Sequence, residues 1–135
     1  MKTFDLRRRD FAKTAILGAA AAALPMAAHA AAPEENLVFS KDTPGHWAGK
    51  EATHVPQVTV NGGMLMVKTN HPQSDAHFIV SHSVVLDGGK YLDRKVFTPK
   101  DAPESMYTLP AGYKGKVIVT STCNLHDWWT NTITV

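Results

Sequence analysis

The sequence predicts an all-β protein, an immunoglobulin-like β-sandwich of about seven strands that follows a cleaved signal peptide. Short runs of apolar and β-branched residues alternate in the manner of strands. Turn residues such as Asn-Gly-Gly, Asp-Gly-Gly and Pro-Ala-Gly separate these runs, and no window after residue 30 has a convincing helical period. Short strands with turns at short intervals, in a chain of this length, are typical of a β-sandwich.

Residues 1–30 are predicted to be a twin-arginine signal peptide. Residues 7–13 contain an Arg-Arg-x-Phe-x-Lys core, residues 14–24 are apolar, and residues 28–30 read Ala-His-Ala, a small-x-small cleavage pattern. The apolar run is too short for a permanent membrane-spanning helix. The alternative, an amphipathic helix of a cytosolic protein, is disfavoured because the run has no polar face. We therefore expect export to the periplasm, with residues 31–135 as the mature domain.

The charge of the mature domain argues against a nucleic-acid partner. Removing residues 1–30 takes away five of the 14 Lys and Arg residues and two of the 12 Asp and Glu residues, which leaves nine against ten. The basic character of the whole chain is therefore a property of the signal peptide. We also expect no membrane association after cleavage, and leave open whether the domain forms a homo-oligomer.

The predicted strands follow one another along residues 31–135. A short edge strand or arm comes first, and Gly-rich residues 45–49 form a loop. A hairpin turn at residues 61–63 joins the next two strands. Met64 and Met66 are expected in the core, and His82 on one buried face with Phe78, Val80, Val84 and Leu86. The strands are expected at residues 37–39, 57–60, 64–69, 77–86, 91–97, 105–109, 116–122 and 130–135.

Four histidines and the single cysteine are candidate ligands for one metal ion. Each falls at a strand end or in a loop, where a β-scaffold can bring side chains together at one rim. Cys123 cannot close a disulfide within the chain, because it is the only cysteine. The alternatives are surface or hydrogen-bonded histidines and a buried, inert cysteine. The candidate ligands are His54, His71, His77, Cys123 and His126.

Over about residues 43–135 the sequence resembles the superoxide reductase family, which includes the neelaredoxins and the catalytic half of the desulfoferrodoxins. The matching pieces are Gly49, His-Val-Pro at residues 54–56, His-Pro-Gln-Ser-Asp-Ala-His-Phe-Ile at residues 71–79, and Cys-Asn-Leu-His-Asp-Trp-Trp at residues 123–129. The resemblance implies an immunoglobulin-like fold. It also implies one iron per chain, ferrous or ferric, with the four histidines as nitrogen ligands and Cys123 as the axial thiolate.

The resemblance implies one-electron reduction of superoxide to hydrogen peroxide at this iron. A ferrous ion with these five ligands has one open position for superoxide, and the thiolate pushes electron density toward the bound oxygens. An unidentified exported donor must then reduce the iron. One cysteine cannot make a four-thiolate site, so a one-iron member is expected.

Two departures from the family pattern concern residues near the site. The family has Gly-Glu-Lys-His-Val-Pro, in which the lysine attracts superoxide and the glutamate caps the ferric site. Here Ala52 and Thr53 stand directly before His54, and the charged residues Lys50 and Glu51 lie further upstream in reversed order. We consider Lys50 and Glu51 as catalytic substitutes, or alternatively as solvated charges. Asp127 replaces a usual glycine and either hydrogen-bonds near the site or points to solvent.

Two other functions are open. One is a non-catalytic iron-binding or redox-sensing module. The altered Lys50-Glu51 region leaves this alternative open, because it departs from the family pattern. The other is a blue-copper electron carrier, but such sites use two histidines, a cysteine and commonly a methionine. No methionine follows His126, and His71 and His77 would be surplus.

Overall fold

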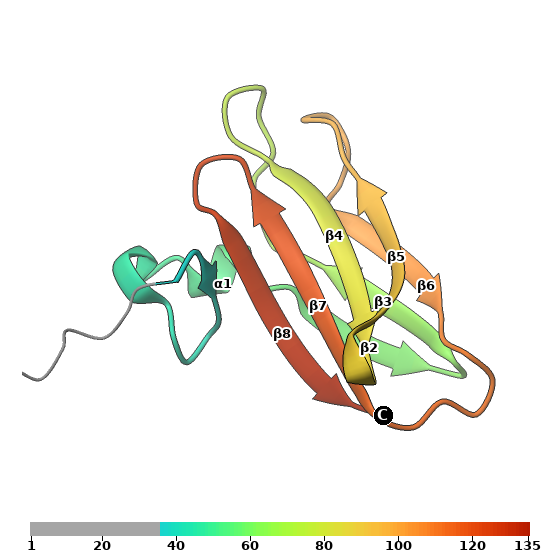
Figure 1. Ribbon diagram of the computed structural model, residues 1–135. Helices are drawn as coiled ribbons and strands as arrows, with labels where there is room; N and C mark the ends of the chain where they lie inside the picture. The colour runs from blue at the N-terminus through green and yellow to red at the C-terminus, as the bar shows by residue number, and fades with distance from the viewer. Residues whose placement is uncertain (1–35) are drawn as a thin grey trace, which may run out of the picture. The chain divides into compact units, whose positions relative to one another are not determined.

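Two β-sheets make up the part of the chain that the structure describes. The computed structural model describes residues 36–135, so the expected signal peptide at residues 1–30 lies outside the described residues. One sheet has five strands in the order β1-β8-β7-β4-β5, and the other has three in the order β2-β3-β6 (Figure 1). The all-β class is confirmed, with eight strands instead of about seven.

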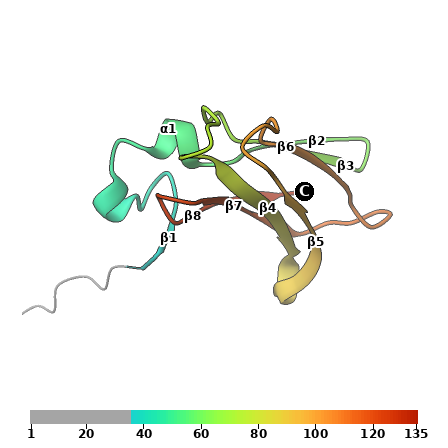
Figure 2. The same ribbon diagram turned by 90° about the horizontal axis from the view of Figure 1, so that it is seen from above.

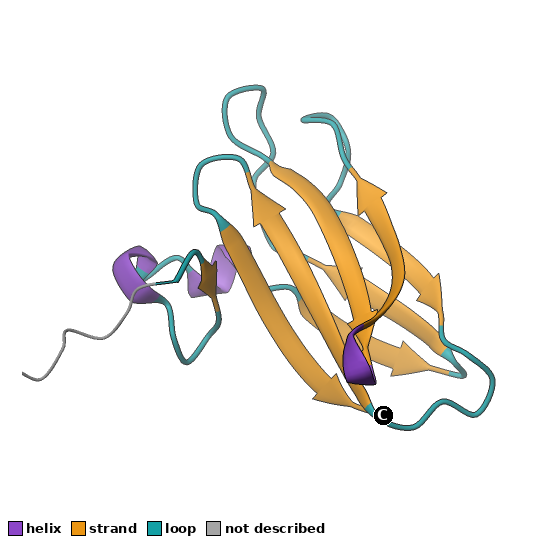
Figure 3. Cartoon of the chain, in the orientation of Figure 1, coloured by secondary structure: helices purple, strands orange, loops and turns teal. Residues whose placement is uncertain are grey.

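Helical segments are few and short, as Figure 3 shows. None of the helices within residues 36–135 has the length and apolar character needed to cross a bilayer. The expected loop at residues 45–49 contains a short 3-10 helix, and a single α-helical turn not foreseen from the sequence precedes β2. The elements are β1 (Val38–Phe39), η1 (Gly45–Trp47), α1 (Glu51–His54), β2 (Gln57–Asn61), β3 (Met64–Lys68), β4 (Ile79–Leu86), η2 (Asp87–Gly89), β5 (Lys90–Val96), β6 (Glu104–Thr108), β7 (Lys116–Cys123) and β8 (Trp128–Thr134).

The main core lies between the sheets, which form two layers in Figure 2. Alternate residues of β4 and β7 meet alternate residues of β3 and β6 there, because successive side chains of a strand point to opposite faces. The strongest alternation is in β7, where every second residue is buried. The buried members are Leu65, Val67, Val84, Leu86, Tyr107, Leu109, Val117 and Val119.

The predicted hairpin between β2 and β3 is confirmed. Asn61 pairs with Met64, which leaves Gly62 and Gly63 as a two-residue turn with φ of 56° and 83°. Positive φ at both central residues is the type I′ geometry, whose twist matches that of the flanking strands. Glycine adopts this geometry without a steric penalty.

A β-bulge in β4 makes the burial along this strand differ from the expected pattern. Ile79 pairs with Cys123 and Ser81 with Thr122, so the strand carries one extra residue between these pairs. His82 is fully buried on the face of Val84 and Leu86, as expected, but Val80 is only half-buried. The bulge instead places Ile79 in a second buried cluster with Phe97 and Cys123. An extra residue reverses the alternation, and the sequence pattern alone does not reveal this.

The expectation that Met64 and Met66 belong to the core is wrong. Met64 is 36% exposed and Met66 is 39% exposed, whereas the alternate residues Leu65 and Val67 are buried. A one-residue change in strand phase exchanges the two faces. Because methionine and leucine are both apolar, hydrophobicity did not distinguish the faces of this strand.

We expect Leu65→Ala to lower the free energy of unfolding by about 2–5 kcal/mol, because it leaves a cavity in the fully buried core. Met66→Ala on the adjacent outward face should change it by no more than about 0.5 kcal/mol. Urea denaturation of both variants checks this. Equal losses would contradict the assignment of the two faces.

Candidate metal centre

Three segments bring the predicted ligands to one end of the sandwich. His54 ends the helical turn α1. His71 and His77 lie in the connection between β3 and β4. Cys123 ends β7, and His126 lies in the short loop before β8. Because β4 and β7 are neighbours in the five-stranded sheet, the last two segments meet beside each other.

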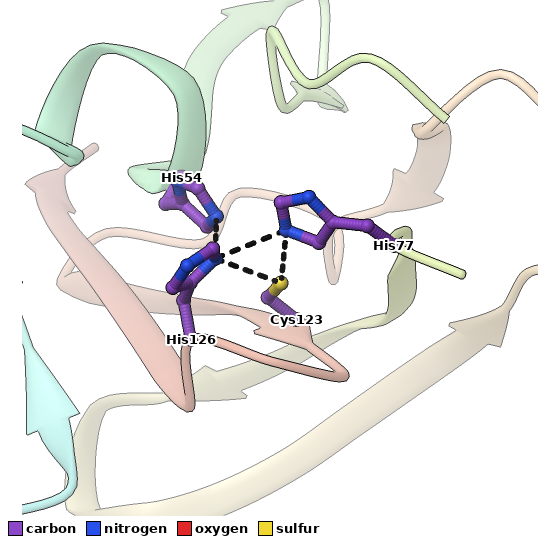
Figure 4. A group of neighbouring side chains, drawn as sticks. All are labelled: His54, His77, Cys123 and His126. Atoms are coloured by element: carbon purple, nitrogen blue, oxygen red, sulfur yellow. Dashed lines mark hydrogen bonds between the residues drawn. The ribbon is translucent and has the colours of Figure 1, made fainter. Parts of the chain in front are cut away.

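Four of these residues form a compact group of ligand atoms. The nitrogens of His54, His77 and His126 and the sulfur of Cys123 all lie within 4.8 Å of one another (Figure 4). His126 presents Nδ1, while His54 and His77 present Nε2. His71 adjoins the group, since its Nε2 lies 3.0 Å from Nε2 of His77. All five predicted residues therefore come together.

The contacts of His77 indicate a common centre and not a set of ordinary hydrogen bonds. Its Nε2 lies 3.0 Å from Nε2 of His71, 3.0 Å from Nδ1 of His126 and 3.2 Å from Sγ of Cys123. One imidazole nitrogen has either one proton or one lone pair, so it cannot serve three such partners. The atoms instead point toward a shared position, as the ligands of a metal ion do.

The spacing of these atoms fits a first-row metal ion. Metal–nitrogen bonds of about 2.1 Å place nitrogens at adjacent corners of a square about 3.0 Å apart. The successive contacts from His71 to His77, from His77 to His126 and from His126 to His54 are each 3.0 Å. A thiolate bound to the same ion at about 2.3 Å would lie about 3.1 Å from a neighbouring nitrogen. The sulfur of Cys123 lies 3.2 Å and 3.6 Å from the nitrogens of His77 and His126.

Hydrogen bonds to the far side of each ring orient the histidines. Nδ1 of His54 lies 3.0 Å from the carbonyl oxygen of Lys50 and 2.9 Å from Oγ1 of Thr53. Nδ1 of His71 lies 3.1 Å from Oε1 of Gln73. Such partners fix the tautomer and direct the other nitrogen toward a metal. The sequence did not reveal Thr53 or Gln73 in this role.

Burial favours the neutral form of His54, His71 and His126, which leaves each of them a lone pair for a metal. Burial and the neighbouring imidazoles lower the pKa of His54 to about 4, although a hydrogen bond with the carbonyl oxygen of Lys50 acts in the opposite direction. Burial, followed by His77, also lowers the pKa of His71. Burial, followed by the charges of His77 and Lys50, lowers the pKa of His126. Burial raises the pKa of the Cys123 thiol, so metal binding would release its proton.

Asn124 ties the two ligand-bearing loops together, a role that its place in the Cys-Asn-x-His motif did not disclose. Its Oδ1 accepts a hydrogen bond of 3.0 Å from the backbone N–H of Phe78. Its Nδ2 donates one of 3.0 Å to the carbonyl oxygen of Ala76, and its own N–H donates to the carbonyl oxygen of Phe78. These bonds on either side of His77 hold it beside Cys123.

Aromatic and acidic side chains cover the outer side of His126. Nε1 of Trp47 donates a 2.9 Å hydrogen bond to Asp127, and the Trp47 ring meets the His126 ring edge to face at 4.6 Å. Asp127 has a φ of 60°, a conformation in which glycine is usual and aspartate is tolerated. Asp127 therefore does hydrogen-bond beside the site, while Trp129 is buried and Trp128 is about half exposed.

Lys50 and Glu51 lie at the start of α1 with different surroundings. Lys50 is exposed, and its positive charge contributes to the lowered pKa of His126. Glu51 instead accepts a hydrogen bond of 2.9 Å from the N–H of Gly49. The carboxylate of Glu51 is thus held at the helix start.

We expect Asn124→Ala to lower the free energy of unfolding of the metal-free protein by about 1–3 kcal/mol, because two loop-to-loop hydrogen bonds are lost. Asn124→Asp keeps the acceptor for the N–H of Phe78 but turns a carboxylate oxygen toward the carbonyl oxygen of Ala76, so it should not restore the stability of the parent. Thermal unfolding of the three proteins measures the difference. A melting temperature in Asn124→Ala equal to that of the parent would contradict the clamping role.

Comparison with known proteins gives a consistent family. The sequence model described as desulfoferrodoxin matches residues 46–132, and no curated protein sequence matched the chain. Among solved structures, a superoxide reductase (neelaredoxin) from Ignicoccus hospitalis has 25% identity and a TM-score of 0.63, over 73% of this chain and 94% of that chain. The superoxide reductase from Treponema pallidum has 28% identity and a TM-score of 0.54, over 62% of this chain and 67% of that chain.

A third similar structure supports the fold alone. The superoxide reductase (1Fe-SOR) from Giardia intestinalis has 20% identity and a TM-score of 0.55, over 62% of this chain and 98% of that chain. The family match covers more than half of the chain and includes all five candidate ligands. The chain therefore belongs to the desulfoferrodoxin, or superoxide reductase, family, as its motifs predicted.

Proposed function

We propose that the protein is a superoxide reductase, which reduces superoxide by one electron to hydrogen peroxide at a mononuclear non-haem iron. The observation that carries this proposal is the convergence of four candidate ligand atoms, with Nε2 of His71 3.0 Å from Nε2 of His77, at one end of a fold shared with superoxide reductases. The proposed ligands are His54, His71, His77, Cys123 and His126.

The donor set favours iron over zinc and copper. Structural zinc sites are almost always tetrahedral, with four ligands, and this site offers five. Blue-copper sites use two histidines, a cysteine and a distant axial methionine, and this site has four imidazoles. When bound, ferrous iron would supply the electron, and an exported donor would restore it.

The surroundings of Cys123 suit a thiolate ligand. The side chain is buried in the cluster with Ile79 and Phe97, and the N–H of Leu125 points to its sulfur at 3.5 Å. A donor aimed at the sulfur stabilises negative charge there, while the apolar wall excludes water. Such an environment tunes the electron density that the thiolate gives to the metal.

Lys50 is the proposed substitute for the family lysine. It stands four residues before His54, so one helical turn brings it to the same side of α1. Its charge reaches His126, on the rim of the site. An exposed cation there would attract the superoxide anion and raise its encounter rate. Glu51 is proposed as the capping carboxylate, which would require it to leave the N–H of Gly49.

The remaining parts of the proposal concern the cell. Residues 1–30 would direct export by the twin-arginine route, and residues 31–135 would act in the periplasm as an immunoglobulin-like domain. Two facing, mostly antiparallel sheets support that fold subclass. Loading before export would protect iron from competition by copper and zinc, which bind such sites more strongly.

A non-catalytic iron-binding or redox-sensing module is the second candidate. The hydrogen bond between Glu51 and Gly49 favours it, because that carboxylate is engaged away from the ligands. Both candidates predict iron binding, and they differ in the response to superoxide.

We expect stopped-flow mixing of the reduced iron-loaded protein with superoxide to consume superoxide and release an equimolar amount of hydrogen peroxide. A thiolate-to-ferric charge-transfer band should grow at the same rate. An unchanged ferrous spectrum on mixing would remove the catalytic function and leave the sensing module.

The matched control for this experiment is Cys123→Ser. It removes the sulfur and keeps a small side chain, so the charge-transfer band should vanish. Persistence of the band in Cys123→Ser would contradict the assignment of Cys123 as a metal ligand.

We expect Lys50→Ala to lower the second-order rate constant with superoxide by about tenfold, and to weaken its dependence on ionic strength. Lys116→Ala is the control, because Lys116 begins β7 at the opposite end from Cys123. Stopped-flow measurements at low and high salt decide the matter. Equal rates and salt slopes for the two variants would contradict a steering role for Lys50.

A further inference from the structure

His82 is a fully buried histidine that the proposed function does not use. It lies in the middle of β4 with 0% of its surface exposed. A polar ring in an apolar core is costly unless its nitrogens have partners. Both ring nitrogens of His82 do have partners, and these come from two other parts of the fold.

The hydrogen bonds of His82 form one consistent network. Oγ1 of Thr69 donates to Oγ of Ser121 at 2.9 Å, so Thr69 must accept the 2.8 Å bond from Nε2–H of His82. Nδ1 of His82 is then an acceptor, and Oγ of Ser105 donates to it at 2.8 Å. We call these four residues the His82 network. A single tautomer of a neutral ring satisfies every bond in it.

Burial agrees with a neutral ring. It lowers the pKa of His82 to about 4, so the ring carries no charge at neutral pH. The ring of Phe97 meets the His82 ring edge to face at 4.9 Å.

The network joins the two sheets. His82 and Ser121 belong to β4 and β7 of the five-stranded sheet. Ser105 belongs to β6, and Thr69 directly follows β3, so both come from the three-stranded side (Figure 2). Hydrophobic contacts between the sheets have no preferred direction. Hydrogen bonds do, so they fix the position of one sheet relative to the other.

Two members of the network are directly connected to proposed ligands, one by a hydrogen bond and the other along its own strand. The carbonyl oxygen of Thr69 accepts a 2.8 Å hydrogen bond from the N–H of His71. Ser121 lies two residues before Cys123 on the same buried face of β7. Phe97 touches the network on one side and shares a buried cluster with Cys123 on the other.

We propose that the His82 network is a positioning device that holds His71, through Thr69, and Cys123, through Ser121, at a fixed separation across the two sheets. This inference rests on the proposed metal centre and adds residues outside the matching pieces that carry the family resemblance. Its members touch neither substrate nor metal. They act through the backbone of the ligands.

The test uses Co²⁺, whose thiolate charge-transfer band in the near ultraviolet reports the bond to Cys123. Metal-free protein is titrated with Co²⁺ under native conditions, and the dissociation constant and band energy are recorded. We expect Thr69→Val, which keeps the shape and removes the hydroxyl, to raise the dissociation constant about tenfold or more and to shift the band.

Two control variants accompany Thr69→Val. Thr69→Ser restores the hydroxyl and should return the affinity to within about twofold of the parent. Thr120→Val makes the same chemical change at a half-buried position of β7 outside the network, and it should leave the affinity and the band unchanged.

A purely structural role would lower the melting temperature of Thr69→Val while its affinity and band energy stayed those of the parent. That result would overturn the proposal. If Thr69→Val does not fold, Ser121→Ala provides the test, since it removes the acceptor at the other end and leaves Thr69 in place. A folded Ser121→Ala with parental affinity and band would likewise overturn the inference.

The parent protein separates this inference from the proposed function. If the parent binds Co²⁺ with a thiolate band and the variants behave like it, only the positioning role fails. If the parent binds no Co²⁺, the metal centre itself is wrong, and the inference that rests on it falls as well.

Discussion

The antiparallel pairing of β4 with β7 is the constraint on which the site depends. It brings the connection after β3 and the loop after β7 to the same edge, so that His77 and Cys123 meet although they are far apart in sequence. The β-bulge after Ile79 adjusts this pairing at the point where the strands reach the site. Asn124 then fastens the two loops by hydrogen bonds on either side of His77. Without this pairing, the ligands would lie on separate, exposed loops.

Around the ligands, polar groups are used for direction and apolar groups for exclusion of water. Lys50, Thr53 and Gln73 bind the far nitrogens of two histidines, while Ile79 and Phe97 enclose the sulfur. The described residues contain no buried side-chain nitrogen or oxygen atom without a hydrogen-bond partner. A fully satisfied polar network gives a core a unique arrangement, whereas a partly satisfied one weakens it. These contacts hold the side chains of the candidate metal centre in one arrangement.

The sequence predicted most strands, and it predicted which side chains form the candidate metal centre, because both have local signals. Period-two alternation and glycine turns mark strands, and the spacing of histidines around one cysteine marks a metal site. The bulge in β4, the outward face of Met64 and the hydrogen bonds of His82 could not be predicted in this way. Each depends on how strands that are distant in the sequence pair with one another. The sequence of a single strand does not determine that pairing. The helical turn α1 escaped because a single turn is too short to show a hydrophobic period.

The helical turn α1 also bears on the departure from the family pattern before His54, where the family lysine is absent. In an extended chain, Lys50 would be four residues away from His54 and remote from it. In a helical turn, residues four apart lie one above the other on the same side, and here the carbonyl oxygen of Lys50 indeed reaches Nδ1 of His54. The backbone of Lys50 thus orients a ligand while its side chain remains exposed toward the rim. The hydroxyl of Thr53, the residue directly before His54, lies 2.9 Å from Nδ1 of that ring. A lysine directly before His54 is therefore not the only way to set a positive charge near the site, because local conformation can replace adjacency in sequence.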